Sequence, residues 1–225
     1  MTGASRTDSG VHAEHQVATF RTERAVDLRR LPISLNALLP RTIVVYGARV
    51  AEDSFHPIRS CLGKAYRYRF WLGKKVSPFA APYVWQVPEN LDVKRMQASL
   101  SSLNGKHDFT AFCAADSGAK TRVRHVIETR LVQKGPLVDF WIVGDGFLKQ
   151  MVRAIAGTLV QIGLDKRAAD FAPILLSYKR EMAGPTAPAC GLSLCRIFYE
   201  RLYLLDEVVQ WNEDGFNIGL PFTSP

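Results

Sequence analysis

The chain has 225 residues, 47% of them hydrophobic, and its 29 Lys and Arg against 21 Asp and Glu give a formal charge of +8. This balance is typical of a globular protein with a sizeable core and argues against an intrinsically disordered chain. No apolar run is long enough to span a bilayer, and charged residues stand where a signal peptide has its apolar segment. The basic excess favours a polyanionic partner such as a nucleic acid, although many basic proteins bind none.

Cysteine and histidine spacings favour neither a disulfide framework nor a metal site. The cysteines form no C-x-x-C pair, and the five histidines do not add a zinc-ligand spacing. The sequence therefore predicts reduced thiols in a cytoplasmic protein without a bound metal. The four cysteines are Cys61, Cys113, Cys190 and Cys195.

The chain begins with a polar segment bounded by glycines, residues 3–13, which reads GASRTDSGVHA. Hydroxyl residues and glycines around one acid are typical of a tight loop that presents a carboxylate at a fixed angle. The acid is Asp8, and the guanidinium of the nearby Arg6 would favour its ionised form. Such a carboxylate can act as a nucleophile or a base. The alternative is an ordinary Asx turn with a surface ion pair.

The next elements are predicted from hydrophobic spacing. Alternation predicts a strand over residues 16–20, and leucines at helical spacing predict a short helix within residues 28–39, with Pro40 as a stop. β-branched residues predict another strand over residues 43–50.

Residues 64–72 form the second informative stretch, because they alternate with a period of two. One face is aromatic, and the other carries Arg67 and Arg69, which predicts a half-buried strand with a solvent-facing basic side. The proline-rich residues 74–88 are predicted to be a long connecting segment.

The second half is predicted to alternate helices and strands. Asp92 is expected to cap a helix with an apolar stripe, which ends at an Asn-Gly pair. Lys149 and Arg153 are expected to be neighbours on the flank of a later helix. Residues 206–225 show no strong pattern. Further strands are expected over residues 121–131, 138–143 and 192–199, and helices over residues 147–159 and parts of 165–181.

Three of these segments resemble motifs of the tRNA pseudouridine synthase A family. The opening loop is similar to the family pattern G-A-[S/G]-R-T-D-A-G-V-H-A, with Ser9 in place of the usual alanine. The KAYRY of residues 64–68 resembles K-x-Y-x-Y, and the FLKQMVRAIAG of residues 147–157 resembles F-x-x-x-M-V-R-x-x-x-G. The resemblance runs from Gly3 to about Tyr199.

The resemblance implies an α+β fold in two related halves, with mixed, largely antiparallel sheets flanked by helices and a central catalytic cleft. Residues 1–60 would form the N-terminal half with the aspartate loop, and residues 61–225 the C-terminal half with the tyrosine and arginine motifs. Family members carry a further strand and helix before the loop, so the N-terminal half would be incomplete at its start, with an exposed sheet edge. The resemblance also implies a homodimer.

The same resemblance assigns roles at the site. Asp8 would be catalytic, Tyr66 would contact the target base, Arg153 would pair with the carboxylate, and Arg6 would fill the space left by an extruded nucleotide. The implied reaction isomerises uridine to pseudouridine in the anticodon stem-loop of tRNA, at positions 38–40, without a redox cofactor or metal. Whether Asp8 attacks the anomeric carbon, adds to the uracil ring or removes a ribose proton stays open.

Two other functions remain compatible with the sequence. One is a truncated, catalytically impaired relative that binds RNA without modifying it. The other is a carboxylate-dependent hydrolase of a small sugar substrate, which would need a second acid beside Asp8 that the sequence does not offer.

Overall fold

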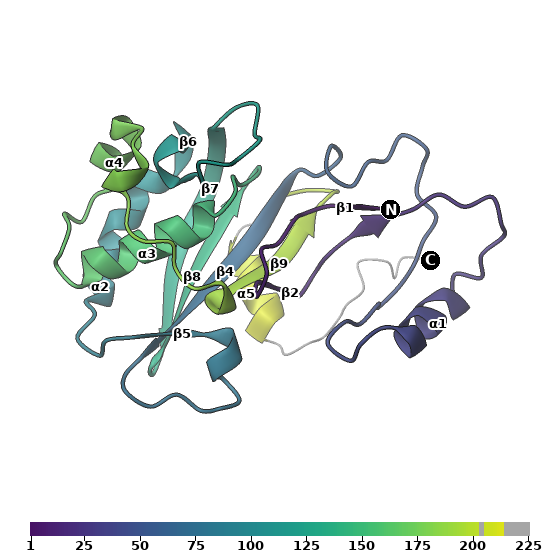
Figure 1. Cartoon of the computed structure of the whole chain (residues 1–225), viewed down its shortest axis with the longest axis horizontal. Helices are drawn as coiled ribbons and strands as arrows, with labels where there is room; N and C mark the ends of the chain where they lie inside the picture. The colour runs from purple at the N-terminus through teal and green to yellow at the C-terminus, as the bar shows by residue number, and fades with distance from the viewer. Residues whose placement is uncertain (203–204, 214–225) are drawn as a thin grey trace.

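A computed structural model describes residues 1–202 and 205–213, and within them one seven-stranded mixed sheet forms the centre of the fold (Figure 1). Its order is β2-β9-β4-β8-β7-β6, with β5 added beside β4. The long neighbours pair antiparallel, whereas β2 runs parallel to β9 and β5 parallel to β4. The strands are β2 (His12–Ala13), β4 (Gly63–Leu72), β5 (Trp85–Val87), β6 (Gly105–Asp108), β7 (Val123–Lys134), β8 (Leu137–Gly144) and β9 (Leu192–Phe198).

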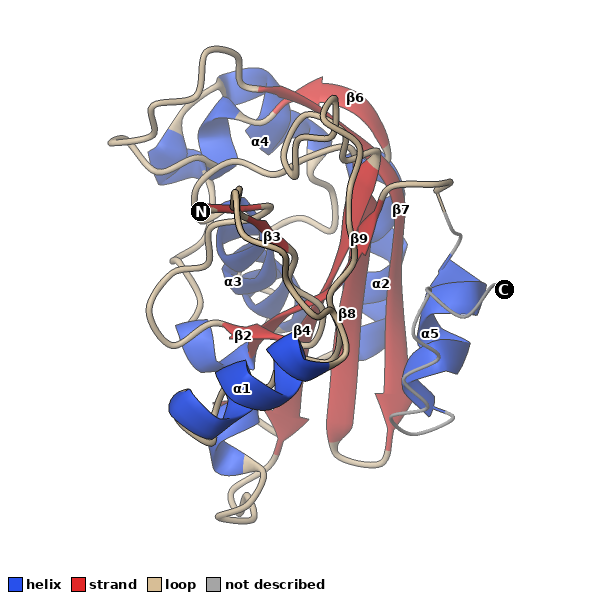
Figure 2. Cartoon of the chain, turned by 90° about the vertical axis from the view of Figure 1, so that its right-hand side faces the viewer, coloured by secondary structure: helices blue, strands red, loops and turns tan. Residues whose placement is uncertain are grey.

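Helices cover both faces of this sheet, which confirms the predicted α+β class with a mixed, largely antiparallel sheet. The main core lies between the sheet and two helices, α2 (Val93–Ser99) and α3 (Met151–Gly163). On the opposite face lies α5 (Leu205–Glu213), as Figure 2 shows. The remaining helices are α1 (Arg30–Leu38) and α4 (Ala172–Ser177).

The start of α2 and the course of α3 follow from particular residues. As predicted, the Asp92 carboxylate caps α2 by accepting a hydrogen bond from the Arg95 backbone N–H at 2.9 Å. In α3, Gly157 permits a close approach of the chain after α4, because a Cβ there would lie 1.8 Å from the Pro185 carbonyl oxygen. The backbone at Pro185 therefore lies directly against the middle of α3.

The solvent-facing basic side predicted for β4 is wrong for Arg67, whose exposed fraction is 6%. Its guanidinium forms an ion pair with Glu14 and lies 5.2 Å from the ring centroid of Trp141. The reason is a second apolar layer, in which Leu205 and Val208 of α5 pack with Trp141 against this face. The alternation of β4 identified its two faces but could not show that a C-terminal helix covers the second one.

The predicted strand over residues 43–50 is also wrong: no strand is assigned there. The segment is instead fixed by the Asn36 side chain, which accepts from the Val45 N–H at 2.7 Å and donates to the Val45 carbonyl at 2.9 Å. β-branched residues favour an extended backbone, but a strand also needs a neighbour to complete its ladder.

Near the chain start, a separate two-stranded ladder joins β1 (Thr2–Gly3) antiparallel to β3 (Ala18–Thr19), which is shorter than the strand predicted over residues 16–20. Between these two strands the chain reaches the edge of the large sheet, where β2 pairs with β9. The division into halves at residues 60 and 61 stays a prediction. None of the described helices is long and apolar enough to cross a membrane.

Candidate active site

The carboxylate of Asp8 forms an ion pair with Arg153, 145 residues further along the chain. The Arg153 Nη1 atom donates to Asp8 Oδ2 at 2.7 Å, and its Nε donates to the Ala187 carbonyl at 2.8 Å. These two acceptors fix the guanidinium from two sides, and the Ala187 N–H donates to the Arg153 backbone carbonyl at 3.1 Å, which ties the two segments together. The Arg153 side chain is 15% exposed and that of Asp8 is 32% exposed. The carboxylate is thus held in place while part of its surface stays accessible.

The loop that carries Asp8 turns back on itself immediately after the acid. The Val11 N–H donates to the Asp8 carbonyl at 3.1 Å, and Gly10 adopts a φ of +80°, a conformation that favours glycine. The loop then enters β2. The tight turn predicted from the glycines and hydroxyl residues is confirmed around Gly10.

Tyr66 of β4 reaches the same loop. Its hydroxyl lies 3.0 Å from Ser5 Oγ, and the Phe147 ring packs edge-on against its ring with 5.1 Å between centroids. Burial raises the pKa of Tyr66, against the opposing effect of the Ser5 hydrogen bond, and the negative charge of Asp8 raises it further. The phenol therefore stays protonated at neutral pH and can donate a hydrogen bond. Tyr66 thus lies close enough to Asp8 for the carboxylate charge to act on its hydroxyl, and their shared role in one site stays a prediction.

Lys64 lies two residues before Tyr66 and so projects from the same face of β4. Its ammonium donates to the Ala4 carbonyl at 3.0 Å and to Ser5 Oγ at 3.2 Å. Burial lowers the pKa of Lys64, against the opposing effect of the neighbouring Cys61 thiol. Neither Lys64 nor Ser5 was predicted from the sequence to act at this site. The available signal was the period-two spacing that places Lys64 beside Tyr66.

A second ion pair lies near the carboxylate. Lys149 Nζ donates to Asp116 Oδ2 at 2.5 Å, and both side chains are exposed. The Asp116 hydrogen bond raises the pKa of Lys149, to which the charge of Asp8 contributes. Lys149 precedes α3, because Gln150 adopts a φ of +62° and the helix begins at Met151. The prediction that Lys149 and Arg153 flank one helical stripe is therefore wrong.

The predicted partnership of Arg6 with Asp8 is not found among the described residues. Arg6 is exposed, and the ion pair to the carboxylate comes from Arg153 instead. His12 connects the loop of Asp8 to the segment around Pro82. Its Nε2 lies 2.9 Å from the Pro82 carbonyl oxygen, and the centroid of its ring lies 4.7 Å from that of Tyr83.

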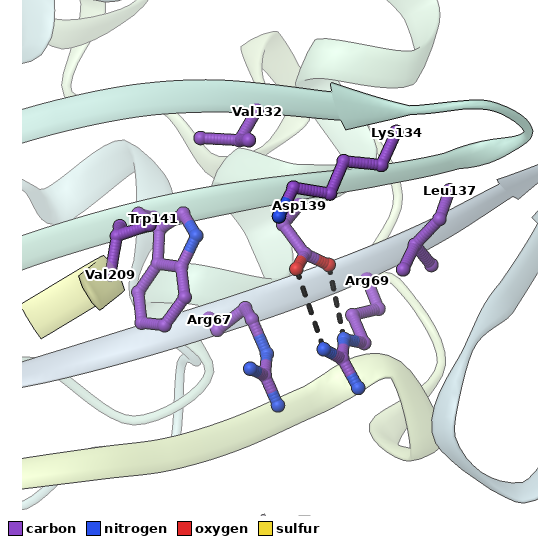
Figure 3. A pocket seen from close by; sticks show the side chains of 8 residues that line it. All are labelled: Arg67, Arg69, Val132, Lys134, Leu137, Asp139, Trp141 and Val209. Atoms are coloured by element: carbon purple, nitrogen blue, oxygen red, sulfur yellow. Dashed lines mark hydrogen bonds and ion pairs between the residues drawn. The ribbon is translucent and has the colours of Figure 1, made fainter. Parts of the chain in front are cut away.

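Other features of the described residues lie away from this site. A hollow of about 150 Å³ on the α5 side of the sheet is lined by Arg67, Arg69 and Trp141, among others, and contains the ion pair of Arg69 with Asp139 (Figure 3). In the described part of the chain, no group of three His, Cys, Asp or Glu side chains is arranged to hold a metal ion.

Comparison with known proteins gives a consistent set of similarities. A family model described as tRNA pseudouridine synthase matches residues 100–200, the part that contains Arg153. The chain is 40% identical to the tRNA pseudouridine synthase A of Geobacillus kaustophilus over 210 residues, covering 93% of this chain and 81% of that protein. It is 42% identical to that of Geotalea uraniireducens, covering 87% and 81%. The Myxococcus xanthus protein of the same name is 42% identical, with 88% and 76% covered.

Proposed function

The chain belongs to the tRNA pseudouridine synthase A family, and from this premise we propose that it isomerises uridine to pseudouridine in tRNA, with Asp8 as the catalytic carboxylate. The observation that supports this most is the contact of Asp8 with Arg153 beside Tyr66. These residues come from three distant segments, and each lies in a motif of the family pattern. An ordinary surface turn with an incidental ion pair would give no reason for Tyr66 to lie beside Asp8 and Arg153.

The chemistry needs few groups, all of which the site can supply. The bond between uracil N1 and ribose C1′ breaks, a bond from C5 to C1′ forms, and the proton on C5 is lost while N1 gains one. No electrons are transferred overall. The site must hold a carboxylate close to the sugar or the base and a donor that binds the detached pyrimidine.

Asp8 serves as that carboxylate, and Arg153 fixes the direction in which its oxygens point. The protonated hydroxyl of Tyr66 serves as a donor to a carbonyl oxygen of the base, and the edge of its ring is supported by Phe147. Arg6, exposed beside this site, takes the place of the extruded nucleotide in the RNA stem.

The macromolecular substrate is a tRNA, and its uridines in the anticodon stem-loop are the proposed targets. The net charge of +8 suits a partner whose phosphates dominate the affinity, so binding should weaken steeply with salt. We further infer that the protein acts in the cytoplasm, as a homodimer. Sedimentation equilibrium measures that assembly directly.

The test uses unmodified tRNA labelled with tritium at C5 of uridine, because formation of the new carbon bond releases that label into water. The wild-type protein should release tritium and produce pseudouridine in the anticodon stem-loop. Asp8→Asn should release none while still retaining labelled tRNA on a filter. A wild-type protein that binds tRNA and never releases tritium would instead establish the binding-only relative. Tritium release from Asp8→Asn at the wild-type rate would refute the role of Asp8.

A further inference from the structure

The ammonium of Lys64 is a charged group near the site that the mechanism so far does not use. It is partly buried, and among the described residues no carboxylate pairs with it; its hydrogen bonds run to the Ala4 carbonyl and to Ser5 Oγ. Removing an ammonium from water without a counter-ion is costly. A strand residue that only needed to pack against the loop could be apolar. We therefore expect the charge of Lys64 to act on its two hydrogen-bond partners, the Ala4 carbonyl and Ser5 Oγ.

The hydrogen-bond chemistry of the cluster restricts where its protons lie. An ammonium can only donate, so Ser5 Oγ accepts from Lys64 at 3.2 Å. Ser5 Oγ and the Tyr66 hydroxyl are 3.0 Å apart, and either could be the donor between them. If Tyr66 donated, the hydroxyl proton of Ser5 would have no acceptor among the described residues. If Ser5 donates, the phenolic proton of Tyr66 is instead the one without an acceptor among the described residues, and it is free to be donated to a bound ligand.

We propose that Lys64 is a positioning residue which, through Ser5, orients the hydroxyl of Tyr66 so that its proton points toward the carbonyl oxygen of the bound pyrimidine. The positive charge of the ammonium repels the hydroxyl proton of Ser5, which therefore points away from Lys64 and toward Tyr66. The hydrogen bond to the Ala4 carbonyl also anchors the chain four residues before Asp8. One lysine thus couples the aspartate loop to the tyrosine strand. This inference rests on the proposed function, since it assigns Tyr66 a pyrimidine as its acceptor.

The kinetic test compares Lys64→Met with Lys64→Arg by tritium release. A general acid or base contributes about 10²- to 10⁴-fold, and a donor that is misdirected but still present should cost less, roughly 10- to 100-fold in kcat. Lys64→Met should show this loss with KM for tRNA within about twofold of wild type, whereas Lys64→Arg, which still donates, should recover most of kcat. Lys106→Met is the matched control, because Lys106 is exposed on β6, and its kcat should be unchanged.

A second readout does not depend on turnover. In protein labelled with ¹³C at the tyrosine ζ carbon, the Tyr66 resonance is assigned by its absence in Tyr66→Phe and reports the hydrogen bonding of that hydroxyl. Lys64→Met and Ser5→Ala should move this resonance in the same direction, and Lys106→Met should leave it in place. Ser5→Ala removes the direct partner of Tyr66 and so shows how large a shift the loss of this hydrogen bond produces. If Lys64→Met fails to fold, Lys64→Leu takes its place in both measurements.

The outcomes separate the inference from the proposed function. If wild type releases no tritium, the proposed function fails, while the Tyr66 resonance still decides whether Lys64 orients the hydroxyl. If wild type is active but Lys64→Met keeps its kcat, the positioning role is refuted. An unchanged Tyr66 resonance in Lys64→Met would refute it as well. A loss confined to KM would mean that Lys64 binds RNA, which also contradicts the proposal.

Discussion

Replacing Arg153 tests whether the guanidinium is what holds Asp8 ready for reaction. Arg153 contacts two acceptors at once, Asp8 Oδ2 at 2.7 Å and the Ala187 carbonyl at 2.8 Å. A lysine is a single donor group on a flexible stem and cannot reproduce this fork. Arg153→Lys should therefore keep the charge but lose one of the two contacts, whereas Arg153→Met loses both.

The expected magnitudes follow from the exposure of the pair. Hydrogen bonds to charged groups contribute about 1.5–3 kcal/mol, and partial exposure of Asp8 reduces the loss in Arg153→Lys to about 1.5–2.5 kcal/mol. At about 1.4 kcal/mol per tenfold, kcat should fall about 10- to 70-fold. Stranding a buried charge costs about 3–5 kcal/mol, which the same exposure reduces to about 2–4 kcal/mol for Arg153→Met. That variant should lose about 30- to 1,000-fold in kcat.

The assay is tritium release under saturating tRNA, with thermal unfolding measured in parallel to confirm that each variant is folded. Arg30→Met provides the control for the loss of one positive charge, because Arg30 is 85% exposed on α1, and it should retain wild-type kcat. If Arg153→Lys keeps more than half of the wild-type kcat, the ion pair is not what positions Asp8, and the reasoning is refuted.

Two predictions concern stability rather than chemistry. Gly157→Ala places a methyl group against the Pro185 carbonyl and should lower the unfolding free energy by about 1–3 kcal/mol, whereas Gly118→Ala, with open space around it, should leave the melting temperature unchanged; equal effects would contradict the close approach. Burial, assisted by Arg196, lowers the pKa of His15 from 6.5 to about 4, so the unfolded chain binds the proton first as the pH falls. Stability should therefore drop by up to about 3 kcal/mol between about pH 6.5 and 4 in denaturant titrations. His15→Gln should remove that part of the pH dependence, and an unaltered profile would contradict it.

The elements that could be predicted from the sequence are those whose signal is local. The cap at Asp92 and the strand β4 each depend on neighbours within a few residues, and both are confirmed. The prediction for residues 43–50 was wrong because a strand is defined by its partner as much as by its own side chains. The helix α5 was missed because the helical spacing of Leu205, Val208 and Val209 extends over little more than one turn, and the burial of Arg67 beneath it was missed with it.

The arrangement of the candidate site likewise could not be predicted from local sequence signals alone. No spacing argument could place Asp8 against Arg153, since the two are 145 residues apart, and only the resemblance to a family brought them together. The resemblance was less informative about the surroundings. It assigned no role to Lys64 and Ser5, whose contacts depend on how the loop lies across β4. The partnership of Arg6 with Asp8 was predicted from their proximity in the loop, and no such ion pair is found among the described residues.

The most direct test of the account is a single-turnover measurement of pseudouridine formation with enzyme in excess over tRNA, comparing Asp8→Asn with Asp53→Asn. Both changes remove one carboxylate and conserve shape, but Asp53 lies exposed in a turn far along the chain from the loop of Asp8. We predict no conversion by Asp8→Asn, at any time over which wild type goes to completion, and wild-type conversion by Asp53→Asn. Conversion by Asp8→Asn at a rate within tenfold of wild type would contradict the central claim.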